Sequence, residues 1–133
     1  MVRLIDTSIW VDYLRPSGAL SLKKAVDVCI EAEEALYTCP ILYELVAGAR
    51  EHEEKYVRAA LSYCERHRFQ PSYWDGAAGL AQRLLRKGVT VSPGDIQIAY
   101  VAMQLEVPVL TNDKHFDLIQ KAVGKSLHVQ HLN

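Results

Sequence analysis

The fold is decided by the stretch VRLIDTSIW at residues 2–10. Residues 2–5 are a short apolar run with β-branched side chains, and the run ends at an acid, Asp6. Thr7 and Ser8, which follow at once, are residue types that start helices. This stretch therefore predicts a buried strand, a tight turn and a helix.

The same alternation continues along the chain. Further strands are predicted at residues 35–39, 107–111 and about 127–129, and residues 89–91 are expected to be extended. Helices are predicted over residues 20–32, 40–49, 51–67, 74–88, 92–106 and from 113 to about 122. Strands that alternate with helices indicate an α/β fold with a mainly parallel sheet. With 133 residues, half of them hydrophobic, we expect one domain over residues 1–133.

Charge and cysteine content exclude several classes of protein. Fifteen basic against sixteen acidic residues leave a net charge of -1, which argues against a strongly basic protein that wraps nucleic acid. No apolar run reaches the ~20 residues of a membrane helix. The amino-terminal residues do not read as a secretory signal, and Cys29, Cys39 and Cys64 form no CxxC pair. We therefore expect a cytoplasmic protein without disulfides.

Four acids fall where a parallel sheet can gather them. Asp6 follows the first strand, Glu44 lies in the helix after the second, Asp95 stands at a helix start, and Asp113 follows the strand at 107–111. The carboxyl ends of parallel strands line a common crevice, so these acids can converge although they are far apart in sequence. The set of four predicts a shared site.

Each acid taken alone has a simpler interpretation. An Asp near a helix start caps free N–H groups, which explains Asp6, Asp95 and Asp113 singly. Ser92 is already a cap, and Asp95 then occupies the acid position of a capping box. Glu44, at the flank of an apolar helix face, fits a solvated residue whose stem covers apolar surface. Both interpretations stay open at this point.

Convergence would have an electrostatic consequence. Two carboxylates ~5 Å apart repel by ~3 kcal/mol at an effective dielectric constant of ~20, so four of them must take up protons or cations. Oxygen ligands without His or Cys favour hard divalent ions, Mg²⁺ or Mn²⁺. Such an ion can polarise a phosphodiester and generate hydroxide from its bound water.

The motifs DTS at 6–8, GDIQIA at 94–99 and TNDKHF at 111–116, with Glu44 between the first two, resemble the PIN domain. The resemblance is closest to the VapC-type toxins of toxin–antitoxin systems. It extends over the whole chain in length and element order.

The resemblance implies a three-layer α/β/α sandwich with a mainly parallel central sheet, and a metal-dependent endoribonuclease that hydrolyses RNA phosphodiester bonds. Asp6, Glu44, Asp95 and Asp113 would be the catalytic acids that bind Mg²⁺ or Mn²⁺. One ion would activate the attacking water and a second would stabilise the leaving oxygen. The hydrogen-bond partners that orient the carboxylates would be Thr7, Ser8, Thr111 and Asn112.

The chain departs from the family pattern at His115, where many relatives have a further acid. Asp117 is the candidate substitute for that acid. Arg50 and Lys114, which neighbour the predicted site in sequence, are candidates for RNA phosphate contacts. The resemblance also implies a small antitoxin partner and a homodimer.

Two rival functions remain. Aspartate-based phosphatases also place an Asp after the first strand, but they need a second acid two residues later, where this chain has Ser8. A non-catalytic RNA- or protein-binding module on the same fold is the other rival. The sequence does not identify which RNA would be cut.

Overall fold

Five strands form one parallel sheet in the computed structural model, which describes residues 1–132. The strand order is β3-β2-β1-β4-β5, and every neighbouring pair is parallel. The first strand of the chain therefore lies at the centre of the sheet. The strands are β1 (Arg3–Ile5), β2 (Ala35–Thr38), β3 (Glu65–His67), β4 (Val109–Thr111) and β5 (Val129–His131).

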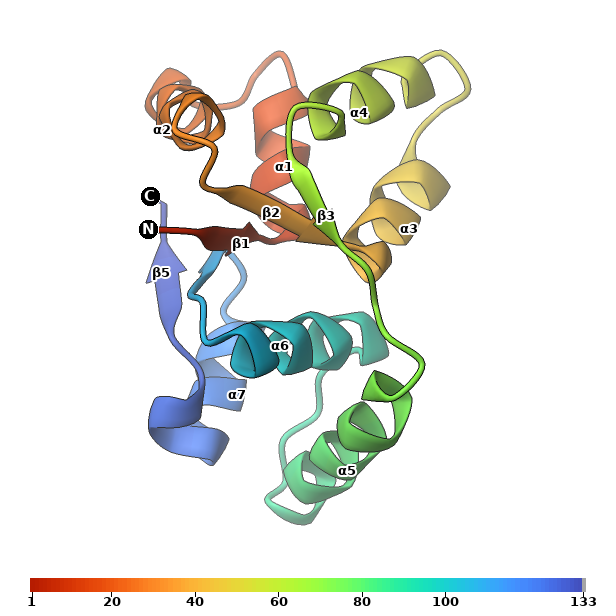
Figure 1. The fold of residues 1–133 in the computed structure, drawn as a ribbon, viewed down its shortest axis with the longest axis vertical. Helices are drawn as coiled ribbons and strands as arrows, with labels where there is room; N and C mark the ends of the chain where they lie inside the picture. The colour runs from red at the N-terminus through yellow and green to blue at the C-terminus, as the bar shows by residue number, and fades with distance from the viewer. Residues whose placement is uncertain (133) are drawn as a thin grey trace.

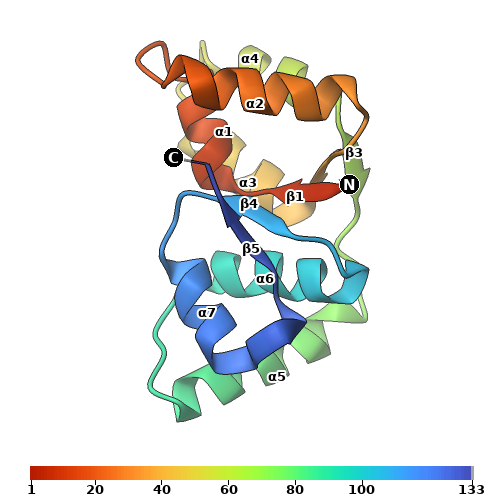
Figure 2. The same cartoon turned by 90° about the vertical axis from the view of Figure 1, so that its left-hand side faces the viewer.

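Helices cover both faces of this sheet. In Figure 1, α1, α2 and α4 lie above the sheet and α5, α6 and α7 lie below it, and Figure 2 shows the same layers from the side. This arrangement confirms the predicted α/β/α sandwich. The helices are α1 (Thr7–Leu14), α2 (Leu20–Glu31), α3 (Cys39–Gly48), α4 (Glu54–Leu61), α5 (Tyr73–Arg86), α6 (Pro93–Leu105) and α7 (His115–Val123), followed by a 3₁₀ turn at Gly124–Ser126.

The core lies on both sides of the central strands. Leu4 and Ile5 of β1 and Val109 of β4 are fully buried, as expected for parallel strands covered on both faces. Trp10 of α1 is buried on one side of the sheet and Ile98 of α6 on the other. The apolar runs that precede Asp6 and Asp113 in the sequence are therefore the central strands β1 and β4.

The prediction of one long helix over residues 51–67 is wrong. The helix in this region, α4, ends at Leu61, and the chain then forms β3, whose residue Glu65 is in register with Leu36 of β2. The apolar stripe of the segment has helical spacing, but β3 is an edge strand with mostly exposed side chains, so it lacks the apolar pattern of a strand.

Two smaller differences concern extended segments. The last strand is β5 (Val129–His131), two residues later than the predicted 127–129. Residues 89–91 form no strand of the sheet. Within residues 1–132, no helix is both long enough and apolar enough to cross a membrane.

The packing of α6 against the sheet gives a stability prediction. Ile98→Ala should lower the free energy of unfolding by about 2–5 kcal/mol, because the side chain is fully buried and its loss leaves a cavity. Leu85→Ala, at an exposed position of α5, should change it by less than about 0.5 kcal/mol. Urea unfolding followed by circular dichroism measures both values. Equal effects of the two substitutions would contradict this account of the core.

Candidate functional site

The site lies where the strand order of the sheet reverses. From β1 the chain continues to β2 on one side, whereas β4 pairs with the other side of β1. Such a switch point opens a crevice at the carboxyl ends of the strands. The backbone N–H of Asp6 donates to the carbonyl of Leu110 at 2.9 Å, so the ends of β1 and β4 are tied together there.

Asp6 is buried at this crevice and is held through one of its two oxygens. Its Oδ2 accepts hydrogen bonds from the Ser8 hydroxyl and the Thr111 hydroxyl, both at 2.8 Å, and from the Ser8 N–H at 3.3 Å. The last of these caps α1, so the capping interpretation is correct for Oδ2. All three of these bonds are made to Oδ2, so Oδ1 is the candidate ligand atom of Asp6.

The segment after β4 joins the same network. Thr111 accepts from the N–H of Asp113 at 2.9 Å, and Ser8 accepts from the N–H of Asn112 at 3.0 Å. Within the described residues, the Asn112 side chain makes no hydrogen bond to the four candidate site acids. Its amide donates to the Asp12 carboxylate at 3.3 Å instead. Ser8 and Thr111 therefore position Asp6 directly, whereas Asn112 acts through its backbone.

Glu44 reaches the crevice from α3. Its Oε1 accepts from the Thr7 hydroxyl at 2.8 Å, which is the orienting role expected of Thr7. Its Oε2 lies against Gly94, where an added Cβ would come within 2.8 Å of that oxygen. Gly94 therefore admits the carboxylate to the start of α6, where the next residue is Asp95.

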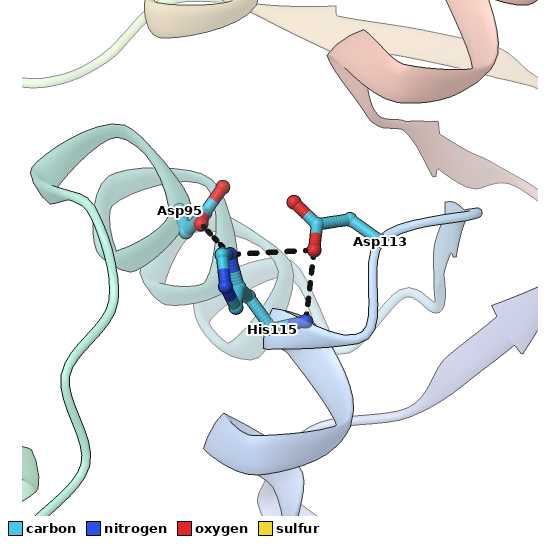
Figure 3. Close-up of side chains that lie close together, drawn as sticks. All are labelled: Asp95, Asp113 and His115. Atoms are coloured by element: carbon cyan, nitrogen blue, oxygen red, sulfur yellow. Dashed lines mark hydrogen bonds and ion pairs between the residues drawn. The ribbon is translucent and has the colours of Figure 1, made fainter.

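Asp95 and Asp113 meet on either side of His115 (Figure 3). The Nδ1 atom of His115 is 3.3 Å from Asp95 Oδ2 and 3.3 Å from Asp113 Oδ1. Asp113 Oδ1 also accepts the N–H of His115 at 2.9 Å, which makes Asp113 a local cap of α7. The cap of α6 is Ser92, which accepts the N–H of Asp95 at 3.2 Å. The Asp95 carboxylate is thus left for the crevice.

Burial and mutual repulsion govern the protonation of this group. Burial raises the pKa of Asp6 in spite of its hydrogen bonds. Burial, followed by the charges of Asp6, Asp95 and Asp113, raises the pKa of Glu44. Burial and the Asp113 charge likewise raise the pKa of Asp95. Asp6, Glu44 and Asp95 therefore resist ionisation in the folded protein, and a bound positive charge would favour their ionised forms.

The donor set fits a divalent cation. Asp95, Asp113 and His115 each offer one ligand atom, and these atoms lie within 4.8 Å of one another. Asp6 and Glu44 are not part of this group of three, although the charges of Asp6, Asp95 and Asp113 all act on the Glu44 carboxylate. A carboxylate-rich site suits Mg²⁺ or Mn²⁺, although the imidazole is a softer ligand than the all-oxygen set expected from the sequence.

The sequence analysis treats His115 only as the residue that replaces an acid of the family pattern, and not as a group that could hold a metal ion. Its position two residues after Asp113, at the first turn of α7, is the signal that was available. Asp117, the proposed substitute acid, lies one half-turn further and is paired with His131 at 2.9 Å, outside the group that contains His115. Arg50 and Lys114 are exposed residues at the ends of α3 and α7.

Glu44 also stands between two surface grooves. One, of about 500 Å³, is lined on α3 by Tyr43 and Glu44 and on the opposite side by Phe69 and Trp74. The other, of about 570 Å³, lies between α1, α3 and α4 and is mostly apolar. Glu44 is therefore the one of the four acids that lines these two grooves.

Comparison with known proteins gives one family. Residues 3–122 match the family model described as the PIN domain. The chain is 29% identical over 127 residues to ribonuclease VapC11 of Mycobacterium tuberculosis, which covers 89% of this chain and 91% of that relative. A VapC ribonuclease of Mycobacterium bovis matches to the same extent.

Solved structures share the fold at lower identity. The VapBC2 structure from Rickettsia felis, bound to a DNA fragment from its promoter, superposes with a TM-score of 0.78 at 18% identity over all of both chains. FitAcB from Neisseria gonorrhoeae gives a TM-score of 0.75 at 20% identity over 96% of each chain.

The raised pKa values predict how stability depends on pH. In the unfolded chain Asp and Glu ionise near 3.8 and 4.5, whereas in the folded protein the pKa values of Asp6, Glu44 and Asp95 are higher. At pH values between the ordinary and the raised pKa values, the folded state binds more protons than the unfolded chain does. The metal-free protein should therefore lose stability as pH rises from the ordinary values through the raised ones.

Thermal melts in EDTA at several pH values measure this loss. The pKa of Glu34 is lowered, chiefly by its hydrogen bond to the amino terminus, and this shift acts in the opposite direction. Comparison with Glu44→Gln isolates the site, because this variant should melt with a shallower decline. Glu31→Gln, at the exposed end of α2, should keep the wild-type slope. Identical slopes in all three proteins would refute the acid cluster.

Proposed function

The chain belongs to the PIN domain family, and on that premise we propose that it is a metal-dependent endoribonuclease, the toxin of a VapBC-type toxin–antitoxin pair. The observation that carries the proposal is that Asp95 and Asp113 lie together with His115 at the carboxyl ends of the strands, where the charges of Asp6, Asp95 and Asp113 also act on Glu44. The names of the relatives, VapC ribonucleases of two mycobacteria, support the same activity.

The contacts of the four acids support cation binding. Thr7 donates to Oε1 of Glu44, Ser8 donates to Oδ2 of Asp6, and the N–H of His115 donates to Oδ1 of Asp113, so the second oxygen of each of these carboxylates is the candidate ligand. Asp95 Oδ2 lies 3.3 Å from His115 Nδ1. These residues would hold Mg²⁺ or Mn²⁺, which when bound supplies a hydroxide from its water and polarises the scissile phosphate. Ser8 and Thr111 keep Asp6 in one orientation, and Thr7 does the same for Glu44.

Ser8 also argues against the phosphatase rival. The rival chemistry needs an acid at this position to protonate the leaving group. Here the Ser8 hydroxyl donates to Asp6 and accepts from Asn112, so it is already committed to holding the carboxylate. A phosphodiester substrate is therefore favoured over a phosphomonoester.

A small antitoxin and a second copy of the chain are the proposed partners. Solved neighbours include a toxin–antitoxin complex from Klebsiella pneumoniae and a member of the VapBC family from Mycobacterium tuberculosis. The mostly apolar groove between α1, α3 and α4, lined by Leu14, Leu45 and Tyr56 among others, suits an apolar segment of the antitoxin. Trp10, in the same helix as Leu14, is fully buried in the core and does not line this groove.

Loss of a single acid tests the catalytic assignment. Asp6→Asn and Asp95→Asn should each lower the rate of RNA cleavage by more than about 100-fold, because loss of partners around a metal ligand alone typically costs ~10–100-fold. Asp117→Asn should cleave at the wild-type rate, since that residue pairs with His131. Cleavage is followed on total RNA with melting curves as the folding control. Wild-type rates of cleavage in both site variants would contradict the assignment of these acids to catalysis.

Metal removal tests the cofactor. Cleavage should stop in EDTA and return with Mn²⁺ or Mg²⁺, and a phosphomonoester should stay intact under both conditions. At 100 times its dissociation constant, Mn²⁺ should stabilise the fold by about 2.7 kcal/mol, which a rise in melting temperature reports. Isothermal titration gives the dissociation constant directly. Cleavage that persists in EDTA would show that the acids act without a cation.

A further inference from the structure

We propose that the groove between α3, α5 and α6 is a nucleobase pocket, in which Trp74 and Tyr43 stack on a base of the RNA next to the phosphate to be cut. The inference rests on the proposed ribonuclease function and adds to it the part of the substrate that this groove recognises. Its lining joins aromatic residues to the acid crevice: Cys39, Pro40, Tyr43, Glu44, Phe69, Trp74, Pro93, Gly94 and Gln97.

Continuity with the acids places the groove on the path of a substrate. Glu44 and Gly94 line the groove, and Glu44 Oε2 lies against Gly94 at the start of α6. The neighbour of Gly94, Asp95, belongs to the acid group. A nucleotide next to a phosphate held at the acids therefore extends into this groove.

The aromatic side chains of the groove are available to a ligand. Trp74 is 57% exposed and Tyr43 is 75% exposed, although both are large rings that a protein usually buries. Single-stranded RNA offers unstacked bases, which bind on such rings because every base has an apolar π face. The volume of about 500 Å³ lies in the range of small-ligand sites and accommodates a nucleoside.

Other aromatic rings pack against Trp74 and its neighbours on this side of the groove. Phe69 packs against Trp74 with ring centres 4.8 Å apart and against Tyr73 at 5.4 Å. Tyr73 in turn packs against Tyr100 of α6 at 5.7 Å. The aromatic wall is therefore anchored to the helix that also presents Asp95, so base binding and the acids share one rigid support.

Polar groups at the same groove favour a base over an apolar peptide. The Gln97 amide has both a donor and an acceptor, and the Tyr43 hydroxyl can do either. A base edge needs such partners, whereas an aliphatic side chain would leave them unpaired. The groove on the other side of Glu44 lacks this combination of Trp, Phe and Gln.

Binding without cleavage separates this pocket from the nuclease activity. Fluorescein-labelled RNA decamers of random sequence are titrated in EDTA, beside an abasic decamer that has the same phosphates but no bases. The wild-type protein should bind the base-bearing RNA more tightly. Trp74→Ala should weaken that binding by roughly 5- to 100-fold, as expected for loss of one stacked base, and should leave abasic binding unchanged. Trp74→Phe should retain most of the affinity.

A matched pair of tyrosines controls for general loss of aromatic surface. Tyr43 and Tyr63 are both 75% exposed, but only Tyr43 lines the groove. Tyr43→Ala should weaken base-dependent binding, and Tyr63→Ala should not. The base-bearing RNA should also quench tryptophan fluorescence in the wild-type protein, because the other tryptophan, Trp10, is fully buried.

The outcomes distinguish the pocket from the proposed activity. Normal RNA cleavage together with equal binding of base-bearing and abasic RNA would overturn the pocket and leave the nuclease intact. Base-dependent binding that Trp74→Ala abolishes supports the pocket even if no cleavage is found. If Trp74→Ala instead halves the mass in solution, measured by light scattering, the face is a dimer contact and the pocket proposal is wrong.

Discussion

The burial of carboxylates beside one another is the constraint to which the rest of the site is fitted. Burial raises the pKa values of Asp6, Glu44 and Asp95, and the neighbouring acids add to the rise for Glu44 and Asp95. Hydroxyl groups of Thr7, Ser8 and Thr111 oppose this by donating to the ionised forms. These hydrogen bonds hold one oxygen of Asp6 and one of Glu44, but they do not neutralise the negative charge of the carboxylates. A cation would do so.

The topology of the sheet explains why this burial can be tolerated. Asp6 comes directly after β1 and Asp113 comes two residues after β4; these are neighbouring strands with buried apolar side chains. The energy that gathers the acids is thus the packing of residues such as Leu4 and Val109, which is independent of the charges. Glu44 and Asp95 then come from helices α3 and α6, and the Glu44 carboxylate occupies space that a side chain at Gly94 would fill.

The places of Asp6, Asp95 and Asp113 in the fold were predictable from sequence because strand ends and helix starts have local signals, whereas Glu44 lies inside α3 and has no such signal. The helix predicted over residues 51–67 failed because β3 is an edge strand, specified by pairing with β2 and not by its own apolar pattern. The shift of β5 by two residues has the same origin, since register depends on β4. The contact of His115 with Asp95 was also beyond sequence reasoning, because it joins the starts of two helices that only the folded sheet brings together.

Glu44 connects the chemistry to the choice of substrate. Its carboxylate belongs to the acid group through Thr7 and Gly94, and the same residue lines both grooves. The rings that flank the aromatic groove, Tyr43 and Trp74, make no hydrogen bond to any of the acids in the described part of the chain. Substitutions at these rings can therefore change which RNA is bound without altering the donors that hold a cation. Proteins that share the acid group but differ in these side chains would then cut different RNAs by one mechanism.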